Sequence, residues 1–264
     1  MRLKISHRTE YRYDAPLQYA LQRLRLFPRT CKTQTVHSWS LAVEGAGEEV
    51  RYVDHFDNDT RLVSNQGEST LIGIDAWGEV ETFDTAGVVG ENRGFAPLWL
   101  FEQQTPLTAA GGGVRELAGS IGEGSELDRL HKLSGAVGAC VAYTAGATHA
   151  GTTAEEALKQ GSGVCQDHAH VFAAAARLMG FPARYVSGYL MMDDAIEQAA
   201  SHAWAEAYVK GLGWVAFDAS NGISPDERYV RVAIGRDYRD AMPVTGIRHG
   251  WAEERLAVSV SVEQ

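Results

Sequence analysis

The chain has 264 residues, of which 45% are hydrophobic and 22% charged, which is typical of a globular protein of one or two domains. Its formal net charge of −10 at pH 7 argues against a nucleic-acid partner. No segment approaches the ~18 uninterrupted apolar residues of a membrane span, and residues 1–16 lack the apolar run of a signal peptide.

The first part of the chain, residues 1–95, is expected to form an antiparallel, β-sandwich-like domain. Residues 2–13, RLKISHRTEYRY, alternate in polarity and are rich in aromatic and β-branched residues. Further strand-like segments follow at short spacing, at residues 37–45, 50–56, 60–69 and 70–83. Gly, Asn and Asp separate them, as in sandwich folds.

Residues 94–106 read as a connector to a second part, 96–264, that begins with helices. Leu127, Leu130, Leu133 and Val137 recur at helical spacing. Residues 152–163, TTAEEALKQGSG, predict a short helix with a Thr cap, acidic residues in the first turn and a Gly stop.

A longer helix is predicted to start at Cys165. Its apolar stripe comprises Ala169, Phe172, Ala173, Ala176 and Met179. The GFP tripeptide at 180–182 ends a helix of this kind, because Gly adopts the left-handed conformation and Pro cannot continue the helix. A turn with two glycines, GSGV, precedes the cysteine.

Strands are predicted next, at residues 184–192, 202–209 and 214–220, with strand-like segments at 228–238 and 255–263. We therefore expect an α+β fold in which helices pack on an antiparallel sheet. The expected core spans about residues 115–222, and C-terminal strands at 228–262 are expected to extend the same domain. The acidic pair Asp193–Asp194 is expected in a solvated turn.

Cys165, His202 and Asp218 have the residue types of a thiol catalytic triad. A helix N-terminus offers free N–H groups and partial positive charge, which favour a thiolate and can stabilise an oxyanion. His202 opens one strand and is the candidate base. Asp218 closes the next strand and is the candidate residue that orients the imidazole.

The two strands must pair in a particular register for His202 to meet Asp218. A three-residue loop at 210–212 places Val209 opposite Gly213 and Asp218 opposite Trp204. Asp218 is then diagonal to His202, at ~7–8 Å between backbones, which a His–Asp hydrogen bond can span. A two- or four-residue loop would put the pair on opposite faces, so we predict an odd-length loop or a bulge.

These residues, with their surroundings, carry a resemblance to a known family. The segments GSGVCQDHAHVFAAAARLMGFPARYVSGYL and SHAWAEAYVKGLGWVAFDAS resemble the core of the transglutaminase-like superfamily. HRTEYRYDAPLQYALQRLRLFPR resembles the β-domain that precedes this core in bacterial members. The resemblance implies a papain-like core in which Cys165 attacks an amide and forms a thioester, His202 protonates the leaving amine and Asp218 holds the imidazole tautomer.

The resemblance implies no cofactor and no metal, and a protein, peptide or small amide as substrate. It also suggests an oxyanion donor from an upstream segment, for which Tyr143 is the nearest candidate. Gln166, Asp167, His168 and Trp204 are expected in the cleft or just behind it.

Simpler interpretations stand beside several of these residues. A zinc site formed by Cys165, His168, His202 and Asp218 is an alternative, although no compact ligand spacing supports it. His170 is expected to be structural, and Trp204, Trp214 and Phe217 to be core or cleft wall. Glu206 is expected to be a charge partner for Arg184.

The three cysteines, Cys31, Cys140 and Cys165, are far apart and include no CxxC pair. This favours free thiols and a reducing cytoplasm. Cys31 and Cys140 are expected to be inert small hydrophobic residues.

The preferred function is a cysteine peptidase or amidase. The alternatives are protein-glutamine transamidation and a catalytically silent binding protein. No nucleic acid and no membrane is expected as a partner, and the sequence leaves the oligomeric state open.

Overall fold

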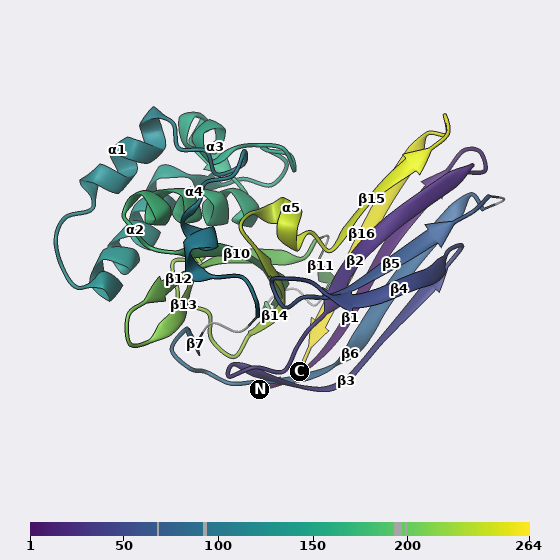
Figure 1. Cartoon of the computed structure of the whole chain (residues 1–264), viewed down its shortest axis with the longest axis horizontal. Coiled ribbons are helices and arrows are strands. Elements are labelled where there is room, and N and C mark those ends of the chain that lie inside the picture. Colours follow the sequence, from purple (N-terminus) through teal and green to yellow (C-terminus); the bar gives the residue numbers. More distant parts are fainter. Residues whose placement is uncertain (68, 92–93, 193–196, 199) are drawn as a thin grey trace.

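The computed structural model describes residues 1–67, 69–91, 94–192, 197–198 and 200–264. The acidic pair Asp193–Asp194 lies outside these ranges. Within them, helices gather at one end of the molecule and long strands extend from the other, so the fold is α+β as expected (Figure 1). Among the described residues, no helix has the length and apolar character needed to cross a bilayer.

The N-terminal part is built from strands. These are β1 (Arg2–Tyr13), β2 (Tyr19–Phe27), β3 (Gln34–Glu44), β4 (Gly47–Val53), β5 (Asp59–Asn65), β6 (Leu71–Thr82) and β7 (Val88–Gly90). Strands β1 to β6 form two antiparallel sheets together with β11 (Glu197–Gln198), β15 (Val244–His249) and β16 (Glu254–Glu263). The strand orders are β11-β16-β1-β6-β3 and β15-β2-β5-β4, while β7 belongs to a third sheet.

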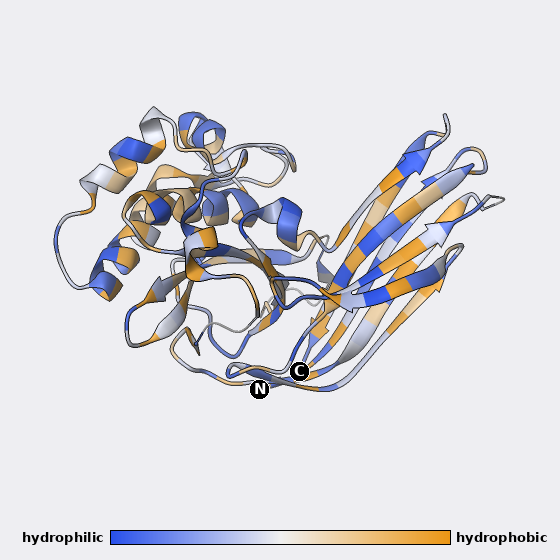
Figure 2. Ribbon diagram, viewed as in Figure 1, coloured by the Kyte–Doolittle hydropathy of each residue, from blue (hydrophilic) through white to orange (hydrophobic). Residues whose placement is uncertain are grey.

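The two sheets face each other across a common apolar core, in which Leu24, Leu26 and Val63 of one sheet meet Ile72 and Ile74 of the other. Buried and exposed side chains alternate along β1, as the period of two in its sequence predicts. Figure 2 shows the same alternation of hydrophobic and hydrophilic residues along the long strands. This β-domain is therefore a sandwich, as expected.

The remaining elements begin with the 3-10 helix η1 (Leu98–Glu102) and the helices α1 (Gly112–Ser120), α2 (Glu126–Cys140), α3 (Ala154–Gln160), α4 (Cys165–Leu178) and α5 (Tyr238–Ala241). The strands are β8 (Ala142–Tyr143), β9 (Ser162–Gly163), β10 (Ala183–Leu190), β11 (Glu197–Gln198), β12 (His202–Val209), β13 (Gly213–Phe217), β14 (Tyr229–Gly235), β15 (Val244–His249) and β16 (Glu254–Glu263). The core sheet has the order β14-β10-β12-β13-β7.

The helix caps read from the sequence are present. Thr153 caps α3 and forms a capping box with Glu156, and Gly161 ends the helix in the left-handed conformation. Gly180 follows the end of α4 with a φ of +86°. In α2, Leu130, Leu133 and Val137 are buried, as their helical spacing predicts.

Helix α4 is more deeply buried than a single apolar stripe predicts. Every residue from Asp167 to Arg177 is buried, because the core sheet covers one side of α4 while α1, α2 and α3 contact it elsewhere. Its run of alanines at 173–176 allows this close packing on several sides. The start of α4 is therefore held firmly in place.

The prediction that the C-terminal strands at 228–262 all extend the second domain is wrong. β16 pairs with β1, and β15 pairs with β2, so both complete the N-terminal β-sandwich. Of the expected C-terminal strands, only β14 joins the core sheet within the described residues, beside β10. A strand with a period of two can pair with any sheet edge of matching polarity, so its sequence does not select the partner.

Cys140 also differs from expectation, because it is exposed at the end of α2 rather than packed as a small hydrophobic residue. Trp204, Trp214 and Phe217, in contrast, are all buried in the core as expected.

Two amide side chains join the β-sandwich to the core sheet. Asn58 donates to the carbonyl of Ile234 at 2.8 Å and accepts from its N–H at 2.9 Å. Gln34 makes the same pair of bonds with the backbone of Arg231, both at 2.8 Å. Both fasten β14, the strand at the edge of the core sheet.

Candidate active site

Cys165 is the first residue of α4, after a turn that Asp167 holds. The buried Asp167 carboxylate accepts the Val164 N–H at 2.8 Å and the Thr148 hydroxyl at 2.6 Å. A Cβ at Gly163 would lie 2.7 Å from this carboxylate, so the position requires glycine. At the first helical position the N–H of Cys165 has no acceptor within the helix, so it can face a ligand.

His168 fastens the same helix start to the neighbouring segment. Its Nδ1 lies 2.9 Å from the carbonyl oxygen of Val164, and its Nε2 lies 2.8 Å from that of Val141. With both nitrogens at backbone carbonyls, the ring has no lone pair directed at Cys165. In the described part of the chain, no three His, Cys, Asp or Glu side chains form a group that could hold a metal. The zinc alternative therefore has no ligand set there.

The hairpin of β12 and β13 brings the candidate base and its partner together. Val209 pairs with Gly213, so the loop has the predicted three residues, 210–212. Ala205 pairs with Phe217, which places Asp218 one position further along, opposite Trp204. Nε2 of His202 lies 2.7 Å from Oδ2 of Asp218. The predicted register is confirmed.

The Asp218 carboxylate is 1% exposed and accepts several further hydrogen bonds. Oδ1 accepts from Ser220 and from the backbone of Asn221, and Oδ2 accepts from the Asn221 amide at 2.7 Å and the Tyr229 hydroxyl at 2.8 Å. Burial acts to raise the pKa of Asp218, but the hydrogen bonds and the His202 charge outweigh it and hold the pKa well below its ordinary value. Asp218 is therefore a fixed negative charge.

His202 carries the matching perturbation. Burial acts to lower its pKa, but hydrogen bonds with Asp218 and Cys165, together with their negative charges, raise the pKa to about 10. The imidazole is thus bonded to the carboxylate, and it lines the same cleft as the Cys165 thiol. This arrangement can hold a thiolate–imidazolium pair and later supply a proton to a leaving group.

Cys165 and His202 open into a cleft of about 580 Å³. Other residues that line it are Tyr143, Ala145, Gly146, Val164, Gln166, Tyr185, Ser187, Leu190, Met192, Gln198, Ala200, Ser201, Ala203 and Tyr238. Of the residues expected around the cleft, Gln166 and Tyr143 line it. Asp167 and His168 instead bond groups behind the cysteine, and Trp204 is buried with its ring 6.3 Å from that of His202.

Tyr143 lies at the mouth of the cleft and is 59% exposed. β8 pairs in parallel with β9, placing Tyr143 beside Gly163, and its ring stacks on His168 at 6.4 Å. Burial of part of the ring, followed by the negative charges of Cys165 and Asp218, raises the pKa of its hydroxyl. The hydroxyl thus remains a neutral donor near the thiol.

Sequence reasoning missed Tyr229, Asn221, Thr148 and Tyr185. Asn221 lies three residues after Asp218, where a polar side chain often bonds the local turn, and this signal was available. Tyr229 and Tyr185 come from other strands of the sheet. Nothing in their neighbouring sequence points to the site. Full burial and the charge of Cys165 raise the pKa of Tyr185 well above its ordinary value.

His170 is buried and does not line the cleft, and its Nε2 accepts the Tyr238 N–H at 3.0 Å. Burial lowers its pKa to about 3, so it is neutral. On the sheet face away from α4, Arg184 and Glu206 are directly paired on adjacent strands. Nε of Arg184 donates to Glu206 at 2.6 Å, which confirms the expected partnership.

Comparison with known proteins agrees with this architecture. Residues 115–219 match the transglutaminase-like superfamily, and residues 3–81 match the bacterial transglutaminase-like N-terminal region. An uncharacterised protein of Mycobacterium leprae is 30% identical, with 99% of this chain and 98% of that protein covered. An uncharacterised protein of Mycobacterium tuberculosis is 28% identical, with 99% and 92% covered. The chain belongs to the transglutaminase-like superfamily.

A crystal structure of a candidate cysteine protease from Cytophaga hutchinsonii has the same fold. It superposes with a TM-score of 0.77 at 22% identity, and the match covers 100% of this chain and 91% of that one. The N-terminal β-domain and the transglutaminase-like core are thus found together in another protein.

Proposed function

We propose that this protein is a thiol-dependent enzyme that cleaves an amide bond through a thioester on Cys165, as a cysteine peptidase or amidase. One observation carries the proposal. His202 is hydrogen-bonded to the buried Asp218 carboxylate, 2.7 Å away, and it lines the same cleft as Cys165, which lies at the N-terminus of α4. A half-buried thiol and imidazole, followed by a buried carboxylate, have the arrangement of an activated nucleophile.

Each residue has a distinct task in the proposed reaction. The Cys165 thiolate attacks the amide carbonyl, and the imidazolium of His202 gives its proton to the leaving amine. Water then enters, His202 takes a proton from it, and the thioester is hydrolysed. Asp218 holds the ring orientation and stabilises the imidazolium, and its firmly ionised carboxylate suits it to this task.

The oxyanion of the tetrahedral intermediate needs at least one donor. The backbone N–H of Cys165 lies at the helix N-terminus, where it is free for this use. The Tyr143 hydroxyl, at the rim of the same cleft, is the proposed second donor. We propose that Gln166 contacts substrate, since it also lines the cleft.

The proposed substrates are proteins, peptides or small amides, and a cleft of about 580 Å³ has room for several residues of an extended peptide. The reaction needs no cofactor. We also propose a cytoplasmic location, which three free cysteines favour. Nucleic acid and membranes are not proposed as partners.

Trapping of the acyl intermediate tests the proposal. The protein would be incubated with amides that present either glutamine side chains or peptide bonds, and adducts on Cys165 would be identified by mass spectrometry. Adducts should form on the wild-type protein and be absent from Cys165→Ala, while Cys140, which is exposed and does not line the cleft, should remain unmodified. The donor that leaves an adduct identifies the acyl class.

Other outcomes separate the alternative functions. Release of free acid in water supports hydrolysis, and transfer to an added primary amine at the expense of hydrolysis would indicate transamidation. Saturable substrate binding with no adduct, even after a rapid acid quench, would contradict the enzyme proposal and favour a binding protein.

A further inference from the structure

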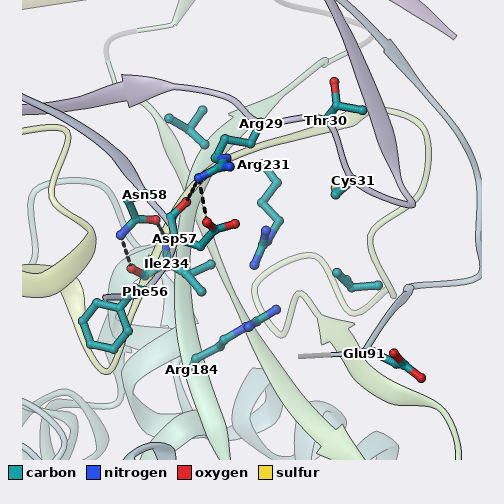
Figure 3. Close-up of a pocket in the computed structure, with 12 residues that line it drawn as sticks. Arg29, Thr30, Cys31, Phe56, Asp57, Asn58, Glu91, Arg184, Arg231 and Ile234 are labelled. Carbon is teal, nitrogen blue, oxygen red and sulfur yellow. Dashed lines mark hydrogen bonds and ion pairs between the residues drawn. The ribbon is translucent and has the colours of Figure 1, made fainter. Parts of the chain in front are cut away.

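A small polar cavity lies on the side of the core sheet that faces away from α4. Loops of the β-sandwich at residues 29–31 and 56–58 cover it, and β10 and β14 form its floor (Figure 3). Its volume is about 50 Å³, and it shares no lining residue with the cleft at Cys165. It is thus separate from the proposed active site.

Two arginines point into this cavity. Figure 3 shows the side chains of Arg184 and Arg231 converging from β10 and β14. The guanidinium of Arg184 is stacked 3.9 Å from the ring centre of Trp214, and the residue is 2% exposed. Stacking and burial fix its position, so it presents a preorganised donor group.

The charges around these arginines do not balance locally. Glu206, which is fully buried, accepts from Nε of Arg184 at 2.6 Å and from Nε of Arg231 at 3.0 Å. One carboxylate therefore serves two guanidinium groups, and one positive charge is left over. Burial is the main cause that lowers the pKa of Arg184 to about 9, and repulsion from the Arg231 charge adds to it.

The other charged residues that line the cavity do not neutralise the excess positive charge at its floor. Arg29 is neutralised by Asp57, whose Oδ1 lies 2.6 Å from Nη1. Glu91 is exposed to solvent and lies apart from the two converging arginines in Figure 3. A charge in solvent is strongly screened, whereas the largely buried pair beneath the cavity is screened much less.

We infer that this cavity is a binding site for a small oxyanion, held by the guanidinium groups of Arg184 and Arg231. Planar guanidinium groups suit carboxylate and phosphate oxygens, and two of them converge here. A cavity needs a volume of roughly 10–15 Å³ to hold one water molecule. This cavity, at about 50 Å³, therefore admits phosphate or acetate but not a nucleotide. An oxyanion there neutralises the excess charge.

Calorimetric titration with inorganic phosphate, against chloride at equal ionic strength, tests this inference on the full chain. We expect one saturable site, and a rise of about 2–4 °C in the thermal midpoint at saturating phosphate. Arg231→Gln should weaken binding by about ten- to a hundredfold. This variant keeps the pair of Arg184 and Glu206, and the Arg231 side chain is already 20% exposed.

Arg255→Gln is the matched control, because Arg255 is an exposed arginine on β16, away from the cavity. It should bind phosphate as the wild type does. Equal binding by wild type and Arg231→Gln, or no saturable binding by wild type, overturns the inference. Acetate in a parallel titration distinguishes a carboxylate site from one that prefers phosphate.

A second measurement needs no variant. Cys31 lines the cavity, whereas Cys140 is exposed on α2. Phosphate should slow the alkylation of Cys31 by iodoacetamide severalfold relative to Cys140, as measured by peptide mass spectrometry. Equal rates with phosphate and with chloride would place the anion elsewhere and refute the assignment.

Discussion

Asp218→Asn should change how folding stability depends on pH. The wild-type carboxylate is 1% exposed and contacts His202 at 2.7 Å. It is one of the two groups that raise the pKa of His202 from 6.5 to about 10. At about 1.4 kcal/mol per pH unit, a rise of this size represents about 5 kcal/mol of preference for the imidazolium in the folded protein, shared between Asp218 and Cys165.

The direction of the pH effect follows from which state binds the proton more tightly. The folded protein holds the His202 proton more tightly, so this stabilisation is fully present below pH 6.5 and is lost as the pH rises toward about 10. The lowered pKa of Asp218 acts in the opposite direction, because its stabilisation is present above about pH 4 and is lost as the pH falls further.

In the variant, the carboxylate no longer offsets the burial of His202. Removing one partner of a buried pair costs about 3–5 kcal/mol, so Asp218→Asn should be less stable than wild type by about this amount near pH 6. The difference should narrow toward about pH 10, where wild-type His202 also loses its proton. Part of the difference in stability should persist at pH 10, because the amide cannot accept every hydrogen bond that the carboxylate accepts.

Urea unfolding near pH 6, 8 and 10 measures this difference. Asp84→Asn is a suitable control, since Asp84 is an exposed acid whose Oδ1 accepts the Ala86 N–H at 2.8 Å, a bond that an amide oxygen retains. Its stability should follow wild type at each pH. If Asp218→Asn lowers the free energy of unfolding by the same amount at all three pH values, the reasoning is refuted, because His202 is then not held as an imidazolium by Asp218.

Three further substitutions test other parts of the structure. Tyr229→Phe removes a 2.8 Å hydrogen bond to the ionised Asp218 and should lower the free energy of unfolding by about 1–3 kcal/mol in urea, whereas no loss would mean that the bond contributes nothing. Gly163→Ala forces the Asp167 carboxylate away from the turn and should slow alkylation of the Cys165 thiol in a timed mass-spectrometric assay; an unchanged rate would contradict the role of this turn. Glu206→Gln leaves two guanidinium groups without their carboxylate and should cost about 3–5 kcal/mol by chemical denaturation, so a loss below about 1 kcal/mol would show that the pair is not needed.

Much of the local structure could be predicted from the sequence. The cap at Thr153, the stop at Gly161 and the register of the β12–β13 hairpin are all confirmed. Each depends on residues that are close in the chain, where backbone geometry limits the choices. The hydrogen bond between His202 and Asp218 follows from that register, because a period of two leaves only one face for both side chains.

Other features depended on contacts between distant segments. The sequence of β16 shows that it is a strand, but only the folded chain shows that it pairs with β1. The burial of α4 on several sides could not be predicted either, because it depends on where three other helices and a sheet pack against it. Cys140 is at the end of an apolar segment, yet no neighbour covers it, and it is exposed.

The sequence by itself determined several of the longer elements, the order of Cys165, His202 and Asp218, and the hairpin that joins the last two, because these rest on local periodicity and turn length. The tertiary structure decided what surrounds Asp218. Tyr229 reaches it from β14, a strand that the sandwich residues Gln34 and Asn58 hold in place. Such contacts arise from how separate layers pack, and local patterns of hydrophobicity carry no information about which layers meet.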